Sequence, residues 1–310
     1  MKSLDSELFF ALSSLAQVHC LQARAHLHTL YNAALPSASQ RTAAITAAMK
    51  SFLDANSIYA FLAARAQSWT HPSPAIDISP PVLGALAALT LAEATLITVL
   101  KDDPYPAAVQ EDRNKASKEW MIRAPEIPKV RAHLFARLCL SAAEHAARAQ
   151  AMLGHARGVD AGFAQYVDDL RRAARGKACR FLGVDAEIAG RTGEGIAWLR
   201  GARGEMGFSG GGDGEAGKKG GFSKMRREWA EKREDRKIER GGAWGADGGR
   251  LEEGRVVDML LAKWEKMNDT VIKEISFSLF PFFSLTFQPL AYHESSHSAD
   301  VKCYITQLTN

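Results

Sequence analysis

Cysteine is scarce in this sequence. Four occur among 310 residues, at Cys20, Cys139, Cys179 and Cys303, and no two of them form a CxxC pair. This spacing excludes a disulfide scaffold and a zinc ribbon, and it indicates a reducing, cytoplasmic compartment. The nine histidines include no HExxH motif and no ligand-like cluster with cysteine. The sequence therefore predicts no metal site and no cofactor.

A strong excess of charge is also lacking. Lys and Arg number 39 against 35 Asp and Glu, which gives a net charge of +4 and a pI near 8.8. The most charged run, KMRREWAEKREDRKIER at 224–240, interleaves both signs. Its acidic residues cancel much of the field that would attract phosphates, so we expect a solvated helix and no nucleic-acid partner. The first residues lack the apolar run of a secretory signal, so no leader is expected.

Strand-like alternation is absent, and apolar residues recur instead at the three- and four-residue steps of amphipathic helices. The first stripe consists of Leu4, Leu8, Ala11, Leu12, Leu15 and Val18. The second consists of Ile45, Met49, Phe52, Tyr59 and Leu62. Further helices are expected at 80–100, from about 128 to 154, around 166–182, at 185–199 and at 256–267. Together these stripes predict an all-α protein.

The apolar stretch from Val82 to Leu100 is nominally long enough to cross a bilayer. Glu93 would then lie near mid-depth, where an ionisable group is costly, and the many Ala and Thr residues make the stretch only weakly lipophilic. A buried helix in a helical stack explains it better. Ser79 can cap this helix, and the two prolines that follow are tolerated in its first turn.

Two glycine-rich motifs resemble catalytic loops by spacing. Residues 204–221 hold too much glycine for a helix or a core, so we expect a flexible loop. Within it, Gly212–Lys218 has phosphate-loop spacing, but Lys219 replaces the hydroxyl residue that would hold magnesium. Ser209 fits G-x-S-x-G, but no strand precedes it as a nucleophile elbow requires. We expect no enzyme; an enzyme using Ser209 or this loop is the alternative.

A family resemblance appears further along the chain. Residues 178–187 and 191–202 look like a tetratricopeptide-like helical hairpin that packs through small residues such as Ala197 and Ala202. The same stretch, with Ile76–Pro80 and the apolar helix that follows, resembles the Bro-type domain of Alix-like ESCRT adaptors. The match sharpens over 100–107, 112–115, 118–121 and 124–140, which resemble the fungal pH-response members of that family. The resemblance implies an elongated helical domain.

The likeness runs from about Lys2 to Thr270, with further matches at 244–247 and 266–270. We therefore expect a Bro-type helical domain at 1–270, incomplete at its N-terminus because the family has a further portion before the segment like 2–12. Residues 271–310 hold the Phe-rich run ISFSLFPFFSLTF and do not resemble the family. We expect them to be a disordered, foreign tail, from an incompletely spliced or mispredicted gene.

The resemblance implies a non-catalytic adaptor in ambient alkaline pH signalling. Such a domain binds a filament-forming ESCRT-III subunit and, with other members of the pH-signalling complex, supports proteolytic activation of a zinc-finger transcription factor at the plasma-membrane cortex or endosome. Membrane association would be peripheral and through partners. The family's apolar patch for the partner helix corresponds here to Thr98, Val99, Ala108 and Val109. Val99 and Val109 are equally compatible with a plain core role, and a general endosomal-sorting scaffold is the alternative function.

Overall fold

The computed structural model describes residues 4–31, 37–68, 75–113, 129–208, 233 and 245–269 of the chain. Within these ranges every regular element is helical, which confirms the predicted all-α class. The elements are α1 (Leu4–His28), η1 (Thr29–Tyr31), α2 (Ala38–Ala66), η2 (Ile76–Ile78), α3 (Pro80–Asp102), α4 (Tyr105–Arg113), α6 (Lys129–Gly154), α7 (Ala161–Ile188), α8 (Thr192–Glu205) and α10 (Arg250–Met267).

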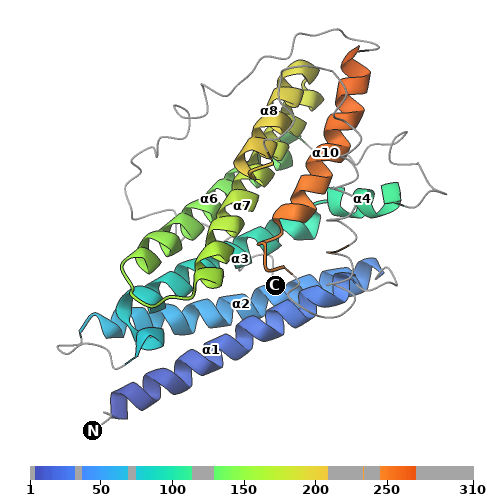
Figure 1. Ribbon diagram of the computed structural model, residues 1–310. Helices are drawn as coiled ribbons and strands as arrows, with labels where there is room; N and C mark the ends of the chain where they lie inside the picture. Colours follow the sequence, from blue (N-terminus) through green and yellow to red (C-terminus); the bar gives the residue numbers. More distant parts are fainter. Residues whose placement is uncertain are drawn as a thin grey trace.

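The long helices form an elongated stack in which each packs on the next in sequence (Figure 1). α1 packs on α2, α2 on α3, α3 on α6, α6 on α7, and α7 on α8. α10 then lies across α8, α7 and α4. One apolar cluster joins α1, α2 and α3, and a second joins α3, α6 and α7. A third joins the end of α3 to α4, α6, α7, α8 and α10, so α3 contributes to all three.

The two apolar stripes predicted for the first two helices differ in how far the structure buries them. The apolar residues predicted for α2 are all buried, as expected of a helix packed between α1 and α3. On α1 the buried residues are instead Phe9, Ala16, Cys20 and Ala23, which face α2. Most of the predicted α1 stripe points outward, and Leu4 is 86% exposed; only Leu12 packs against the core cluster. The helix was therefore correctly predicted, but most of the residues predicted for its buried face are exposed.

α3 is the apolar helix for which a membrane span was considered. It is long and apolar enough to cross a bilayer. However, 72% of its most apolar 18-residue stretch is buried inside the protein, where the helix packs between α2 and α6. The carboxylate in its middle, on Glu93, is buried and accepts hydrogen bonds from Arg24 at 3.1 Å and from the Tyr166 hydroxyl. Burial as a core helix with a paired charge agrees with the preferred interpretation. Ser79 precedes the helix as expected, but its hydroxyl donates to the Ile76 carbonyl instead of capping.

α7 and α8 form the predicted hairpin, and the turn lies between its two predicted halves, 178–187 and 191–202. Two helical stretches were expected, around 166–182 and at 185–199; α7 instead continues without a break to Ile188, and Gly190, at a φ of 78°, makes the turn. Glycine at 183 and 195 lets the helices approach closely, because a Cβ on Gly195 would lie 3.0 Å from the Gly183 carbonyl oxygen. Ala197 and Ala202 are buried in the same packing, as predicted.

Several sequence predictions lie outside the described residues. These are the phosphate-loop-like motif at 212–218, Ser209, most of the charged run at 224–240 and the whole tail at 271–310. The expected flexible loop at 204–221 is described only at its start. There Gly204 and Glu205 belong to the last turn of α8, so the helix extends slightly into the glycine-rich segment.

Candidate partner-binding site at the junction of α3 and α4

The four residues predicted to meet a partner lie together where α3 gives way to α4. Thr98, Val99 and Ala108 are at most 4% exposed. The Thr98 hydroxyl donates to the Ala94 carbonyl and also lies 3.5 Å from the Met49 sulfur on α2. Val109 is the exception, since it is partly exposed while it packs against the same core cluster as Val99 and Ala108. The structure thus brings the four residues together but leaves only Val109 within reach of a partner.

The junction between the helices is short and is held by one buried carboxylate. Asp103 follows the last residue of α3 in extended conformation, and its side chain accepts a hydrogen bond from the Tyr105 backbone N–H at 3.1 Å. This bond satisfies a donor in the first turn of α4 that has no partner within the helix. The sequence Asp103-Pro-Tyr105 therefore both ends α3 and begins α4, which fixes the direction in which Val109 is presented.

Asp103 in turn pairs with Arg180 of α7, a fully buried arginine. The Arg180 Nη2 lies 2.6 Å from the Asp103 carboxylate, and its Nε lies 2.5 Å from the Glu253 carboxylate on α10. The guanidinium also packs over the rings of Tyr105 and Phe181, at 5.1 and 4.2 Å from their centroids. A single side chain thus connects α7 to the α3–α4 junction and to α10.

Glu253 has a second cationic partner, which completes this buried charge cluster. Lys177, one turn before Arg180 on α7, lies 2.9 Å from its carboxylate. Burial alone would raise the pKa of Glu253, but the charges and hydrogen bonds of Arg180 and Lys177 outweigh burial and lower the pKa to about 2. Glu253 is therefore ionised at every physiological pH. We refer to Asp103, Lys177, Arg180 and Glu253 as the Arg180 cluster.

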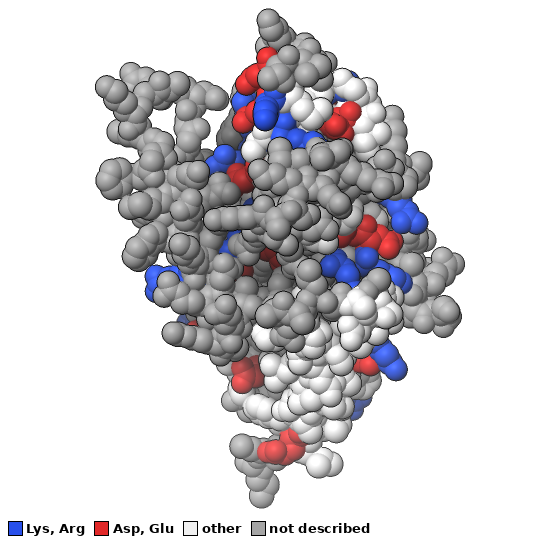
Figure 2. All heavy atoms as spheres, turned by 90° about the vertical axis from the view of Figure 1, so that its right-hand side faces the viewer, with Lys and Arg blue, Asp and Glu red and all other residues white. Residues whose placement is uncertain are grey.

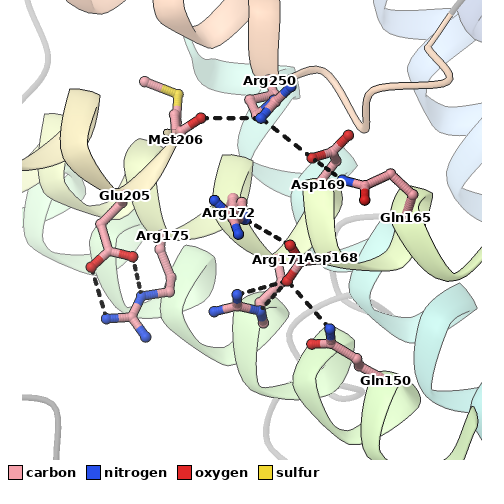
Figure 3. A network of polar contacts seen from close by, with 10 residues as sticks. All are labelled: Gln150, Gln165, Asp168, Asp169, Arg171, Arg172, Arg175, Glu205, Met206 and Arg250. Atoms are coloured by element: carbon pink, nitrogen blue, oxygen red, sulfur yellow. Dashed lines mark hydrogen bonds and ion pairs between the residues drawn. The ribbon is translucent and has the colours of Figure 1, made fainter. Parts of the chain in front are cut away.

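A second polar network holds the same, N-terminal end of α10 (Figure 3). Asp168 on α7 accepts hydrogen bonds from Arg171 and Arg172 of the same helix, at 2.7 and 2.6 Å. Beside it, Asp169 pairs with Arg250 at the start of α10, at 3.5 Å, and Arg250 also donates to the backbone carbonyl at the end of α8. These contacts cross between α7, α8 and α10, so they orient α10 on the hairpin.

No direct signal in the sequence points to the Arg180 cluster. Its directly paired members are 73 to 77 residues apart in sequence, and no spacing rule connects them. Next to the exposed Glu144 on α6, His145 is buried, at 7% exposed. Among the described residues no group of three or more His, Cys, Asp or Glu is placed to hold a metal ion. The junction offers buried salt bridges and a partly exposed apolar side chain, an arrangement that suits docking.

These features place the chain in the class of elongated, all-α helical-stack proteins. Against curated proteins, it is 46% identical over 288 residues to the pH-response regulator protein palC of Emericella nidulans. The alignment covers 86% of this chain and 57% of palC, so the chain spans little more than half the length of that relative. The chain is therefore related to palC. No family model matches it, and no solved structure matches it.

Proposed function

We propose that this protein is a non-catalytic adaptor in the response to ambient alkaline pH. The observation that carries this proposal is the 46% identity to palC, a pH-response regulator by name, across nearly the whole of this chain. The fold is compatible with the proposal, because stacked helices present extended surfaces to other polypeptides. In the described part of the chain, Arg180 and Arg250 form salt bridges between helices, where they have a structural role.

We propose further that the stack is a Bro-type domain that binds the terminal helix of a filament-forming ESCRT-III subunit. An amphipathic helix would lie along α4 with its apolar face against Val109. Ala108 on the inner face of α4, and Thr98 and Val99 at the end of α3, would hold the junction together without touching the partner, since all three are buried. The Arg180 cluster would hold α4 in place, because Asp103 fixes its first turn. This division separates one contact residue from three supporting residues.

In this proposal the protein acts in the cytoplasm and reaches the plasma-membrane cortex or endosome through its partners. Together with other pH-signalling proteins, the assembled complex supports proteolytic activation of a zinc-finger transcription factor. A general endosomal-sorting scaffold is the competing function. The relation to palC favours the pH response, because palC is named for that response.

Complementation tests the proposed function. A strain of Emericella nidulans that lacks palC should grow poorly at alkaline pH, and this chain should restore growth there while leaving growth at acidic pH unchanged. Because the chain spans 57% of palC, a palC fragment trimmed to the aligned region is the matched control. If that fragment restores alkaline growth and this chain does not, the proposed pH-response function is wrong. Normal alkaline growth of the deletion strain with defective cargo sorting would favour the endosomal scaffold.

A further inference from the structure

Three arginines of the polar network in Figure 3 outnumber the carboxylates with which they pair. Arg171 and Arg172 share the carboxylate of Asp168, at 2.7 and 2.6 Å, and Arg250 pairs with Asp169 at 3.5 Å. The three guanidinium groups therefore carry one positive charge more than the two carboxylates that they contact. All three arginine side chains also reach the surface, with 24–39% of each exposed. We refer to Arg171, Arg172 and Arg250 as the arginine group.

Two guanidinium groups from different helices converge beside Gly207, which follows the end of α8. A Cβ placed on Gly207 would lie 3.3 Å from the Nη1 atom of Arg172 on α7 and 3.7 Å from the Nη1 atom of Arg250 on α10. Gly207 itself is exposed, and because it has no side chain it leaves this position unfilled. The surface at Gly207 therefore offers a small space that is bordered by two cationic groups.

Arg250 is the less tightly held of these two arginines. Its contacts with the Met206 carbonyl and with Asp169 are 3.3 and 3.5 Å long, whereas Arg172 lies 2.6 Å from its carboxylate. The Nε atom of Arg250 is buried and has no hydrogen-bond partner within the described part of the chain. A buried N–H without an acceptor costs free energy, so a guanidinium that turns to meet an acceptor is stabilised. Arg250 can therefore turn toward an anion at Gly207 with little loss of existing contacts.

We propose that Arg172 and Arg250 bind the phosphate of a phosphorylated serine or threonine in a partner polypeptide. A phosphate monoester has three terminal oxygens and close to two negative charges, so it can accept hydrogen bonds from two guanidinium groups that approach from different helices. A carboxylate has only two oxygens, and a single arginine fork can occupy both. Clusters of arginine are a recurring means of recognising phosphorylated motifs. The site uses none of the residues of the proposed docking site on α4 and does not depend on it.

The surrounding charges favour a single phosphate group over an anionic membrane surface. Binding to anionic lipid needs a cluster of basic residues, because each of them contributes only a little by itself. Here the carboxylates of Asp168, Asp169 and Glu205 belong to the same network as the arginines. On the face drawn in Figure 2, basic and acidic side chains of the described residues are likewise intermixed. A localised anion on a polypeptide therefore fits the site better than a lipid bilayer does.

Fluorescence anisotropy with the full chain tests the site. The probe is a labelled peptide of glycine and serine with one central phosphoserine, and the same peptide without phosphate is its control. We expect saturable binding of the phosphopeptide alone. Arg172→Gln or Arg250→Gln should weaken that binding about tenfold or more, because each removes charged hydrogen bonds to the phosphate. Arg200→Gln is the matched control variant, because Arg200 is a half-exposed arginine that pairs with Glu265 between α8 and α10, outside the arginine group.

Three results would overturn the proposal. The first is equal or absent binding of the phosphorylated and unphosphorylated peptides, a comparison that needs no variant. The second is phosphopeptide binding that Arg172→Gln and Arg250→Gln both leave unchanged. The third is preferential binding to vesicles of phosphatidylcholine and phosphatidylinositol phosphate, which would make a membrane the partner. Arg172→Lys, which keeps the charge without the fork, should retain part of the affinity and the thermal unfolding curve of the parent.

Discussion

Replacement of Arg180 by Met should destabilise the protein more than most single substitutions. Arg180 is fully buried and neutralises Asp103 at 2.6 Å and Glu253 at 2.5 Å. Met keeps much of the side-chain volume but leaves the Asp103 carboxylate without its cation in the core, while Glu253 keeps Lys177. Removing one partner of a buried ion pair costs about 3–5 kcal/mol, because the remaining charge is left desolvated and unpaired.

A double-mutant cycle tests whether the unpaired charge on Asp103 causes the loss of stability. Asp103→Asn alone keeps an oxygen that can accept from the Tyr105 N–H but removes the charge that faces Arg180. In the Arg180→Met background the same change should cost less than it does alone, because it then removes an unpaired charge. We expect a coupling free energy of about 1–3 kcal/mol, within the usual range for directly paired residues. Urea unfolding followed by far-UV circular dichroism measures all four proteins.

Two results would refute this reasoning. One is a loss of less than about 1 kcal/mol in Arg180→Met, which is the size expected of an exposed ion pair. The other is strict additivity of the two substitutions, which would mean that the two side chains do not act on each other. Arg191→Met is the control for loss of an arginine, because Arg191 pairs with Glu194 at the surface and both side chains are about half exposed.

Further substitutions test local features of the fold. Burial, with the nearby Arg148 charge as a lesser cause, lowers the pKa of His145 from the ordinary 6.5 to about 4. Between these two values the imidazole is protonated in the unfolded chain and neutral in the folded chain. The free energy of unfolding should therefore fall by about 2 kcal/mol between pH 7.5 and 5, and His145→Gln should remove that loss; equal pH slopes in both proteins would contradict it. Gly248→Ala should cost more than Gly245→Ala, because both have positive φ but only at Gly248 would a Cβ meet backbone, at 2.6 Å; equal melting temperatures would exclude the clash. Ser37→Ala should cost about 1 kcal/mol by removing the cap of α2, while Ser57→Ala should not, as urea melts would show.

The sequence predicts a helix and its buried residues well when the apolar residues of that helix form a single face. α2 is the clearest case, because its predicted apolar residues are the ones in the core. α1 shows the limit: periodicity identifies an apolar stripe but does not say which of two apolar faces meets the neighbour. The hairpin halves at 178–187 and 191–202 were correctly predicted, with Gly190 in the left-handed turn between them, whereas the break expected between 182 and 185 does not occur, because α7 is continuous to Ile188.

The candidate site was less predictable than the fold. The resemblance pointed to Val99 and Val109, which the structure places at the α3–α4 junction, but their burial depends on residues of other helices that lie far away in sequence. The Arg180 cluster joins charges 73 and 77 residues apart, and no local pattern encodes such a pairing. That Val109 makes contact with a partner stays a prediction.

Binding of the partner helix to this chain tests the proposed adaptor role most directly. A fluorescent peptide with the terminal helix of the ESCRT-III subunit should bind the full chain saturably, and Val109→Asp should weaken binding about tenfold or more. Ala107→Asp is the matched control, because Ala107 is exposed on the same short helix and gains the same charge. Equal binding by the parent and both variants would place the partner elsewhere, and no binding by the parent would contradict the adaptor role.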